Sequence, residues 1–151
     1  MGTSVRRAWA IVAVLSVGLL LCAAGTAEDA GARKLEAALV GKEPVGVVCF
    51  GDSVTGVYYH TGGRRAYSEM LELALKRLYP KADVKVINAG VSGHTTIDAL
   101  NRIDADVLAH KPQCVTVMFG LNDMTRVPIE DYEKNLSTII AAVLPHGGDP
   151  S

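Results

Sequence analysis

The sequence predicts an α/β protein in which a parallel sheet lies between layers of helices, an α/β/α sandwich. Two observations lead to this fold class. Three short apolar runs are typical of buried strands, and they alternate along the chain with three longer segments whose apolar residues recur at helical spacing. Strands that alternate with helices are joined by right-handed crossovers, which makes the sheet parallel. A length of 151 residues leaves room for one compact domain.

The three predicted strands are continuous runs of β-branched and other apolar residues. Such runs are expected where a strand is covered on both faces, because no side of it meets water. The predicted strands are Val45 to Phe50, Val84 to Ile87, and Cys114 to Phe119.

Three amphipathic helices follow the strands. The first is predicted over Tyr67 to Tyr79, with Pro80 as a stop signal. The second begins after Thr95 or Thr96, either of which is a suitable N-cap residue. The third runs from about Ile129 to Val143, where apolar residues again recur every three or four positions.

The N-terminus reads as a signal peptide over residues 1–27. Arg6 and Arg7 form its basic region, the stretch from Ala8 to Leu21 is mostly apolar, and Gly25-Thr26-Ala27 supplies small residues for cleavage. We therefore predict a secreted or periplasmic protein. The alternative is a retained membrane anchor, because the uncharged run of 20 residues that ends at Ala27 is about long enough to span a bilayer. Residues 28–43 form a polar lead with a possible short helix over 32–40, and 44–151 form the domain.

Charge and motif content exclude several classes of function. Cleavage would leave 13 basic residues against 16 acidic ones, so no basic field for nucleic acid remains. The sequence has neither a GxGxxG turn nor a GxxxxGK loop, and no histidine or cysteine pair has metal-ligand spacing. We expect no cofactor and no metal.

Small and polar residues stand directly after each predicted strand. The segments are Gly51-Asp52-Ser53, Gly90-Val91-Ser92-Gly93 and Gly120-Leu121-Asn122-Asp123. In an open parallel sheet, ligands bind beyond the carboxyl ends of the strands, so these three segments are expected to line one site.

In order and spacing, Gly51-Asp52-Ser53-Val54-Thr55, Gly90 and Gly120-Leu121-Asn122-Asp123 resemble the first three sequence blocks of the SGNH (GDSL) hydrolase family. The resemblance extends from about Val45 to Val143. It implies a flavodoxin-like three-layer sandwich and the hydrolysis of carboxylic esters, such as acyl or acetyl groups on a carbohydrate or a lipid. The expected partner is thus a small-molecule, glycan or lipid ester, with no membrane partner unless the N-terminal segment is retained.

The resemblance also implies roles for three residues. Ser53 would be the nucleophile, and the oxyanion would be held by the backbone N–H groups of Ser53 and Gly90 and by the side-chain amide of Asn122. A serine needs such donors, and a base to take its proton, before it attacks an ester. Asp52 is expected to fix the turn by accepting hydrogen bonds from neighbouring backbone N–H groups.

The sequence departs from the family at its far end. The family's base is a histidine preceded, three residues earlier, by an aspartate, and none of the four histidines here has that neighbour. We therefore expect a sheet that is incomplete on its C-terminal side and a chain truncated before this block. An inactive fragment or binding remnant is the alternative function. The catalytic base is therefore expected to be absent. His60 and His94 lie in loops near the predicted site, where an imidazole could serve as a substitute base, but we expect them to be solvated loop histidines.

Overall fold

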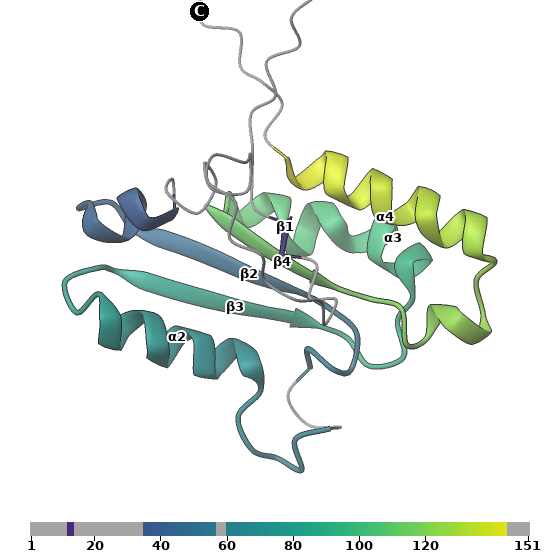
Figure 1. Cartoon of the computed structure of the whole chain (residues 1–151), viewed down its shortest axis with the longest axis horizontal. Coiled ribbons are helices and arrows are strands. Elements are labelled where there is room, and N and C mark those ends of the chain that lie inside the picture. Colours follow the sequence, from purple (N-terminus) through teal and green to yellow (C-terminus); the bar gives the residue numbers. More distant parts are fainter. Residues whose placement is uncertain (1–11, 14–34, 57–59, 145–151) are drawn as a thin grey trace, which may run out of the picture.

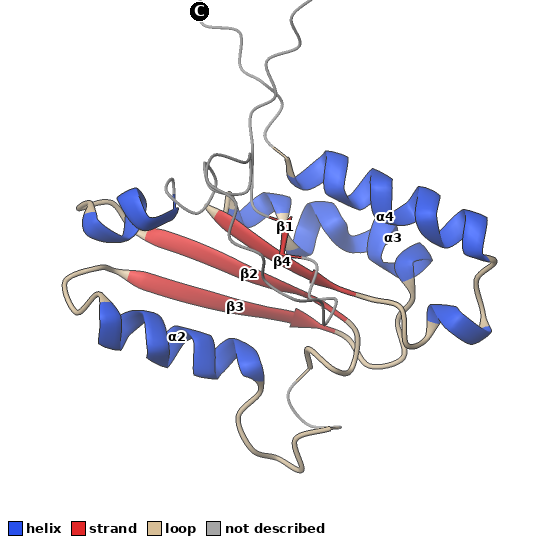
Figure 2. Cartoon of the chain, in the orientation of Figure 1, coloured by secondary structure: helices blue, strands red, loops and turns tan. Residues whose placement is uncertain are grey.

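The computed structural model describes residues 12–13, 35–56 and 60–144. Its strands form one parallel sheet in the order β1-β4-β2-β3. Figure 1 shows the arrangement, and Figure 2 shows the same view coloured by secondary structure. The strands are β1 (Val12–Ala13), β2 (Val45–Gly51), β3 (Val84–Gly90) and β4 (Cys114–Met118).

Helices cover both faces of the sheet, which confirms the predicted three-layer sandwich. Helix α2 (Tyr67–Leu78) packs on the face beside β3, while α3 (Thr96–Asp106) and α4 (Ile129–Val143) lie together on the other face (Figure 1). Two short 3₁₀ helices, η1 (Leu108–His110) and η2 (Asp123–Thr125), join these elements.

The sheet has a hydrophobic core on each face, because successive side chains of a strand point to opposite faces, and β2 and β3 contribute to both cores. The larger core joins the sheet to α3 and α4, and its buried members are Val48, Phe50, Ala89, Ala99, Ile103, Val107, Val115, Val117, Ile139 and Val143. The smaller core lies on the α2 face and is built on Leu39, Val45 and Val84.

The register brings the carboxyl ends of the three long strands to the same edge of the sheet. Gly51 of β2 pairs with Gly90 of β3 and with Met118 of β4. The loops that leave these strands therefore begin side by side, as predicted for a ligand site at the carboxyl edge.

The outer edge of β4 is paired with β1. Val12 pairs with Val115, and Ala13 with Thr116. An exposed edge presents free N–H and C=O groups that an extended apolar segment satisfies. The two described residues of β1 fall within the stretch predicted as a signal peptide. The remainder of that stretch lies outside the described residues, so cleavage after residue 27 stays a prediction.

The predicted boundaries agree with the observed ones to within about three residues. The strand predicted to end at Ile87 continues to Gly90, and the strand predicted to end at Phe119 stops at Met118. Residues 35–40 are helical, inside the short helix predicted over 32–40, whose first residues lie outside the described ranges. None of the helices within the described ranges is both long and apolar enough to cross a bilayer.

The N-terminus of α3 is closed by a hydrogen-bonded pair. Thr95 is the N-cap, and the Asp98 carboxylate accepts hydrogen bonds from its backbone N–H (2.8 Å) and its hydroxyl (2.9 Å). These two hydrogen bonds, the backbone one first, lower the pKa of Asp98. The ionised carboxylate is therefore the form that stabilises the folded chain.

We expect Asp98→Ala to lower the free energy of unfolding at neutral pH by about 0.5 to 1 kcal/mol. Because the folded-state pKa is lowered, this stabilisation is complete above the unfolded-state pKa of about 3.9 and is lost as the pH falls through the lower folded-state value. Urea unfolding of both proteins as a function of pH measures this. Asp104→Ala, an exposed site on the same helix, is the control. A difference between Asp98→Ala and wild type that is independent of pH would contradict the assignment.

Candidate active site

Ser53 stands on a tight turn at the end of β2 and is 6% exposed. Asp52 shapes this turn. Its Oδ1 accepts a hydrogen bond from the Val54 N–H (2.8 Å), and its backbone carbonyl accepts from the N–H groups of Thr55 (3.2 Å) and Gly56 (3.0 Å). The prediction that Asp52 fixes the turn is confirmed. Within the described residues the N–H of Ser53 itself has no acceptor, so it is available to a ligand.

A histidine lies within hydrogen-bond distance of the Ser53 hydroxyl. Ser53 Oγ and His60 Nε2 are 3.0 Å apart. Of the two histidines that the sequence offered as a substitute base, the structure brings His60 to Ser53. His94 instead contributes its backbone carbonyl, which accepts a hydrogen bond of 2.9 Å from Asn122 Nδ2.

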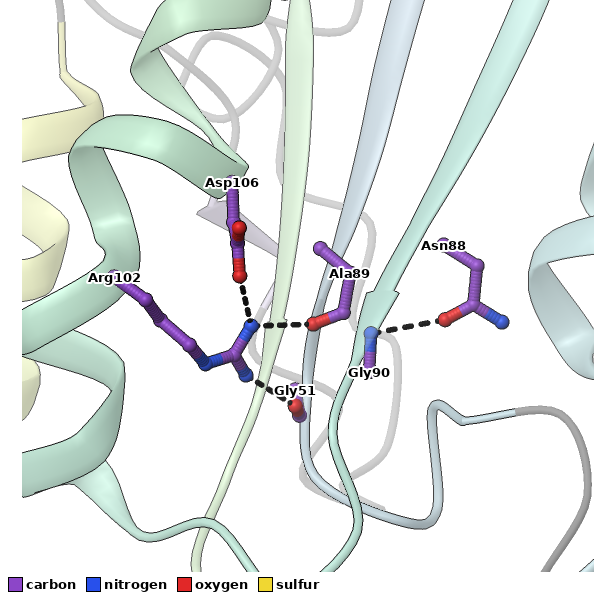
Figure 3. A network of polar contacts seen from close by, with 6 residues as sticks. All are labelled: Gly51, Asn88, Ala89, Gly90, Arg102 and Asp106. Carbon is purple, nitrogen blue, oxygen red and sulfur yellow. Dashed lines mark hydrogen bonds and ion pairs between the residues drawn. The ribbon is translucent and has the colours of Figure 1, made fainter.

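Gly90 is the last residue of β3, and the backbone of Thr55 and Gly56 passes close to it. A Cβ at this position would come within 2.6 Å of the Thr55 carbonyl carbon and would overlap the Gly56 nitrogen, so only glycine fits. Its N–H donates to Asn88 Oδ1 at 2.9 Å, as Figure 3 shows. The same Asn88 side chain donates to the Thr55 carbonyl and to Ser68 Oγ, both at 2.9 Å. The Gly90 donor is therefore already used within the protein.

Asn122 ties the three strand-end segments together. Its side-chain amide donates to Asp52 Oδ2 (3.2 Å) in the Ser53 turn and to the carbonyl of His94 (2.9 Å) in the loop after β3. Arg126 reinforces this link by donating to the Asn122 carbonyl (3.2 Å) and to the Gly93 carbonyl (2.6 Å). The segments that the sequence predicted to converge are thus joined by direct hydrogen bonds.

Asp123 holds the third segment to helix α3. Its Oδ1 accepts from the backbone N–H of Thr96 (2.8 Å) and from the Thr96 hydroxyl (2.6 Å), to which Asn135 Nδ2 also donates (3.1 Å). A carboxylate is favourable there because the N-terminus of a helix carries partial positive charge. Asp123 is 2% exposed, and its contacts give it a structural role.

Arg102 of α3 is a central residue of this region that the sequence did not reveal. Its guanidinium donates to the carbonyls of Ala89 (2.9 Å) and Gly51 (2.8 Å), which are at the ends of β3 and β2, and to Asp106 Oδ2 (2.7 Å), as drawn in Figure 3. The guanidinium carbon also lies 4.5 Å from the centre of the Phe50 ring. One side chain therefore fixes the two strand ends from which the site loops leave.

Gly93 belongs to a segment that the sequence predicted to line the site, although no particular role was assigned to it. It has a φ of +81°, a conformation that favours glycine, and a Cβ there would meet no atom within 4 Å. Within the described residues its N–H has no acceptor. An isolated glycine between polar residues, just past a predicted strand, was the available signal.

An open hollow of about 400 Å³ adjoins the third segment. Gly120 and Asp123 contribute to its wall, and its apolar lining comes mainly from Met124, Val127 and Ile129.

The two described cysteines do not compete with Ser53 as nucleophiles. Both are free and buried. Burial raises the pKa of the Cys49 thiol and raises that of Cys114 to about 11, so both remain protonated at neutral pH. Within the part of the chain that the structure describes, no three histidine, cysteine, aspartate or glutamate side chains gather as metal ligands would.

Comparison with known proteins gives a consistent result. Residues 49–150 match the GDSL-like Lipase/Acylhydrolase family. An acetylxylan esterase from Geobacillus stearothermophilus is 33% identical over 82 residues, which are 47% of this chain and 37% of that protein. An uncharacterized lipoprotein, YqeF, from Bacillus subtilis (strain 168) is 31% identical over 115 residues, which are 69% of this chain and 45% of that protein.

The fold of this chain is also similar to that of solved structures. A lipase/acylhydrolase from Enterococcus faecalis superimposes with a TM-score of 0.57 at 31% identity, covering 66% of this chain and 52% of that one. The chain thus spans less than half the length of these two curated relatives and about half of this solved structure.

Proposed function

Because the chain belongs to the GDSL-like lipase/acylhydrolase family, we propose that it hydrolyses carboxylic esters with Ser53 as the nucleophile. The family membership confirms the resemblance predicted from the three sequence blocks. The observation that carries the proposal is the Ser53 turn, where a serine hydroxyl beside an imidazole nitrogen at 3.0 Å stands next to an unused backbone N–H.

Ester hydrolysis at this site would proceed through an acyl-enzyme. Ser53 Oγ attacks the carbonyl carbon, the carbonyl oxygen becomes an oxyanion, and the alcohol leaves. Water then releases the acid. Preorganised donors that hold the oxyanion are usually the largest catalytic contribution, and each one typically accounts for about a hundredfold to a thousandfold in kcat.

The donors are proposed to come from the three strand-end segments. The Ser53 N–H is the first, since it has no acceptor within the described residues. Asn122 would be the second: its amide donates to Asp52 Oδ2 and to the His94 carbonyl, and it would exchange one of these hydrogen bonds for one to the oxyanion. Gly90 would be the third, by the same kind of exchange, since its N–H donates to Asn88 Oδ1. The N–H of Gly93, in the same loop, has no acceptor within the described residues and is a second candidate for this place.

The proposed substrates are acyl or acetyl esters of a carbohydrate or a lipid. This substrate class is supported by an acetylxylan esterase among the relatives. The proposed location is outside the cytoplasm, by secretion or in the periplasm. The N-terminal leader pattern supports this, and one relative is a lipoprotein.

Covalent labelling tests this proposal directly. The 151-residue chain is treated with a fluorophosphonate, which phosphonylates activated serines, and the modified peptide is located by mass spectrometry. We expect one label, on Ser53, together with turnover of p-nitrophenyl acetate. A folded chain that takes no label and shows no turnover would instead support the non-catalytic alternative.

A further inference from the structure

We propose that His60 is the general base that activates Ser53 in this chain. The inference deepens the proposed function and rests on it, because a base has a role here only if Ser53 attacks an ester. It concerns a residue outside the three strand-end segments, in the loop between β2 and α2.

Position is the first argument. His60 Nε2 lies 3.0 Å from Ser53 Oγ, within the 2.6 to 3.2 Å or so expected between a base and the proton it removes. His110 ends the 3₁₀ helix η1, after α3, and His94 is fixed near Asn122 through its backbone carbonyl. Among the histidines that the structure describes, His60 is the one in hydrogen-bond contact with the Ser53 hydroxyl.

The chemistry of the group is the second argument. Histidine is the side chain best suited to take and return a proton near neutral pH. Asp52 and Asp123, the carboxylates of the strand-end segments, are bound to backbone and side-chain donors of the protein, and neither is in hydrogen-bond contact with Ser53 Oγ within the described residues.

The proton transfers in this mechanism return His60 and Ser53 to their starting protonation states. With its own hydrogen on Nδ1, His60 accepts the Ser53 proton on Nε2 while Oγ forms its bond to the carbonyl carbon and the carbonyl π electrons move to oxygen. When the tetrahedral intermediate collapses, the bond to the alcohol oxygen breaks, and His60 returns the proton to that oxygen. His60 next takes a proton from water, whose oxygen attacks the acyl-enzyme, and returns it to Ser53 Oγ as the acid leaves.

A further feature is that base and nucleophile come from one short loop, seven residues apart. No pairing with a later strand is needed to bring them together. The alternative is a loop histidine that accepts a hydrogen bond and has no part in proton transfer. The two differ in whether an added base restores the function of a chain without His60.

The experiment compares the 151-residue chain with His60→Ala and His60→Gln. His110→Gln, an exposed histidine away from the site, is the matched control. We expect both His60 variants to lose about 10² to 10⁴-fold in kcat for p-nitrophenyl acetate, with KM changed by less than threefold. The rate of fluorophosphonate labelling at Ser53 should fall in parallel. Added imidazole should restore part of the activity to His60→Ala, and the control should match wild type.

Other outcomes separate the two proposals. If both His60 variants keep wild-type kcat and labelling while Ser53 still reacts, His60 is not the base, and the proposed function stands. If the variants are inactive but folded by circular dichroism, and imidazole restores nothing, a structural role replaces the catalytic one. If the wild-type chain itself neither reacts nor turns over ester, both proposals fail. A misfolded His60→Ala leaves His60→Gln, nearer in size and polarity, to decide between these results.

Discussion

Ser53→Ala is expected to reduce kcat for p-nitrophenyl acetate by about three to six orders of magnitude while leaving the fold intact. The reason is that the variant removes the only atom that forms a bond to the substrate. Ser53 is buried, at 6% exposure, on a turn that Asp52 holds, so the loss of its hydroxyl is not expected to disturb the surface of the protein. Steady-state kinetics with active protein concentration fixed by absorbance measures the loss, and fluorophosphonate labelling should disappear with it.

The matched control for this variant is Ser137→Ala. Ser137 lies on α4, where its hydroxyl donates to the Glu133 carbonyl at 2.8 Å, and it has no part in the proposed site. The control should keep wild-type kinetics. Equal hydrolysis by Ser53→Ala and wild type would place the nucleophile elsewhere.

The fold was largely predictable because its signals are local. Continuous apolar runs located the three long strands, and apolar spacing with caps and stops located α2, α3 and α4. The errors fall where tertiary contacts decide. β3 continues through Asn88 and Ala89 to Gly90 because β2 offers it partners as far as Gly51, although small residues there read as a turn.

Only the candidate site residues that belong to a recognisable sequence motif could be predicted from the sequence. Ser53, Asp52 and Asn122 were singled out from short segments whose order and spacing match known blocks, and the catalytic roles of Ser53 and Asn122 remain proposals. Arg102 gave no such signal, since one arginine on an amphipathic helix normally faces water, and only the folded chain shows that its side chain is 13% exposed and aimed at two strand ends. The occupied N–H of Gly90 likewise depends on an Asn88 side-chain contact that the sequence cannot specify.

The proximity of His60 illustrates the same limit. His60 lies seven positions after Ser53, and a loop of that length can follow many paths. The sequence therefore offered His60 and His94 as equal candidates, and the position of the imidazole beside the hydroxyl appeared only in the structure.

Arg102→Ala should lower the free energy of unfolding by about 3 kcal/mol, the largest loss of stability we expect from one side chain. Hydrogen bonds from a charged group contribute about 1.5 to 3 kcal/mol each, and two go to the carbonyls of Gly51 and Ala89. The guanidinium also lies over Phe50, at 4.5 Å, and Phe119, at 5.8 Å, and such contacts contribute about 0.5 to 2 kcal/mol. The buried Nε without a partner offsets part of this sum.

Urea unfolding followed by circular dichroism measures the effect, with Lys76→Ala as the control. Lys76 pairs with Glu72 one turn away on the outer face of α2, and such pairs contribute about 0.2 to 0.5 kcal/mol. Arg102→Lys adds a sharper comparison, because an ammonium group lacks the planar fork that spans two carbonyls and stacks on a ring. Lysine should therefore recover less than half of the loss. If Arg102→Ala lowers the free energy of unfolding no more than Lys76→Ala does, Arg102 does not hold the two strand ends. If the loss is about 3 kcal/mol, the folded fraction of Arg102→Ala should also hydrolyse ester more slowly, because the loops that carry Ser53 and Gly93 leave from those strand ends.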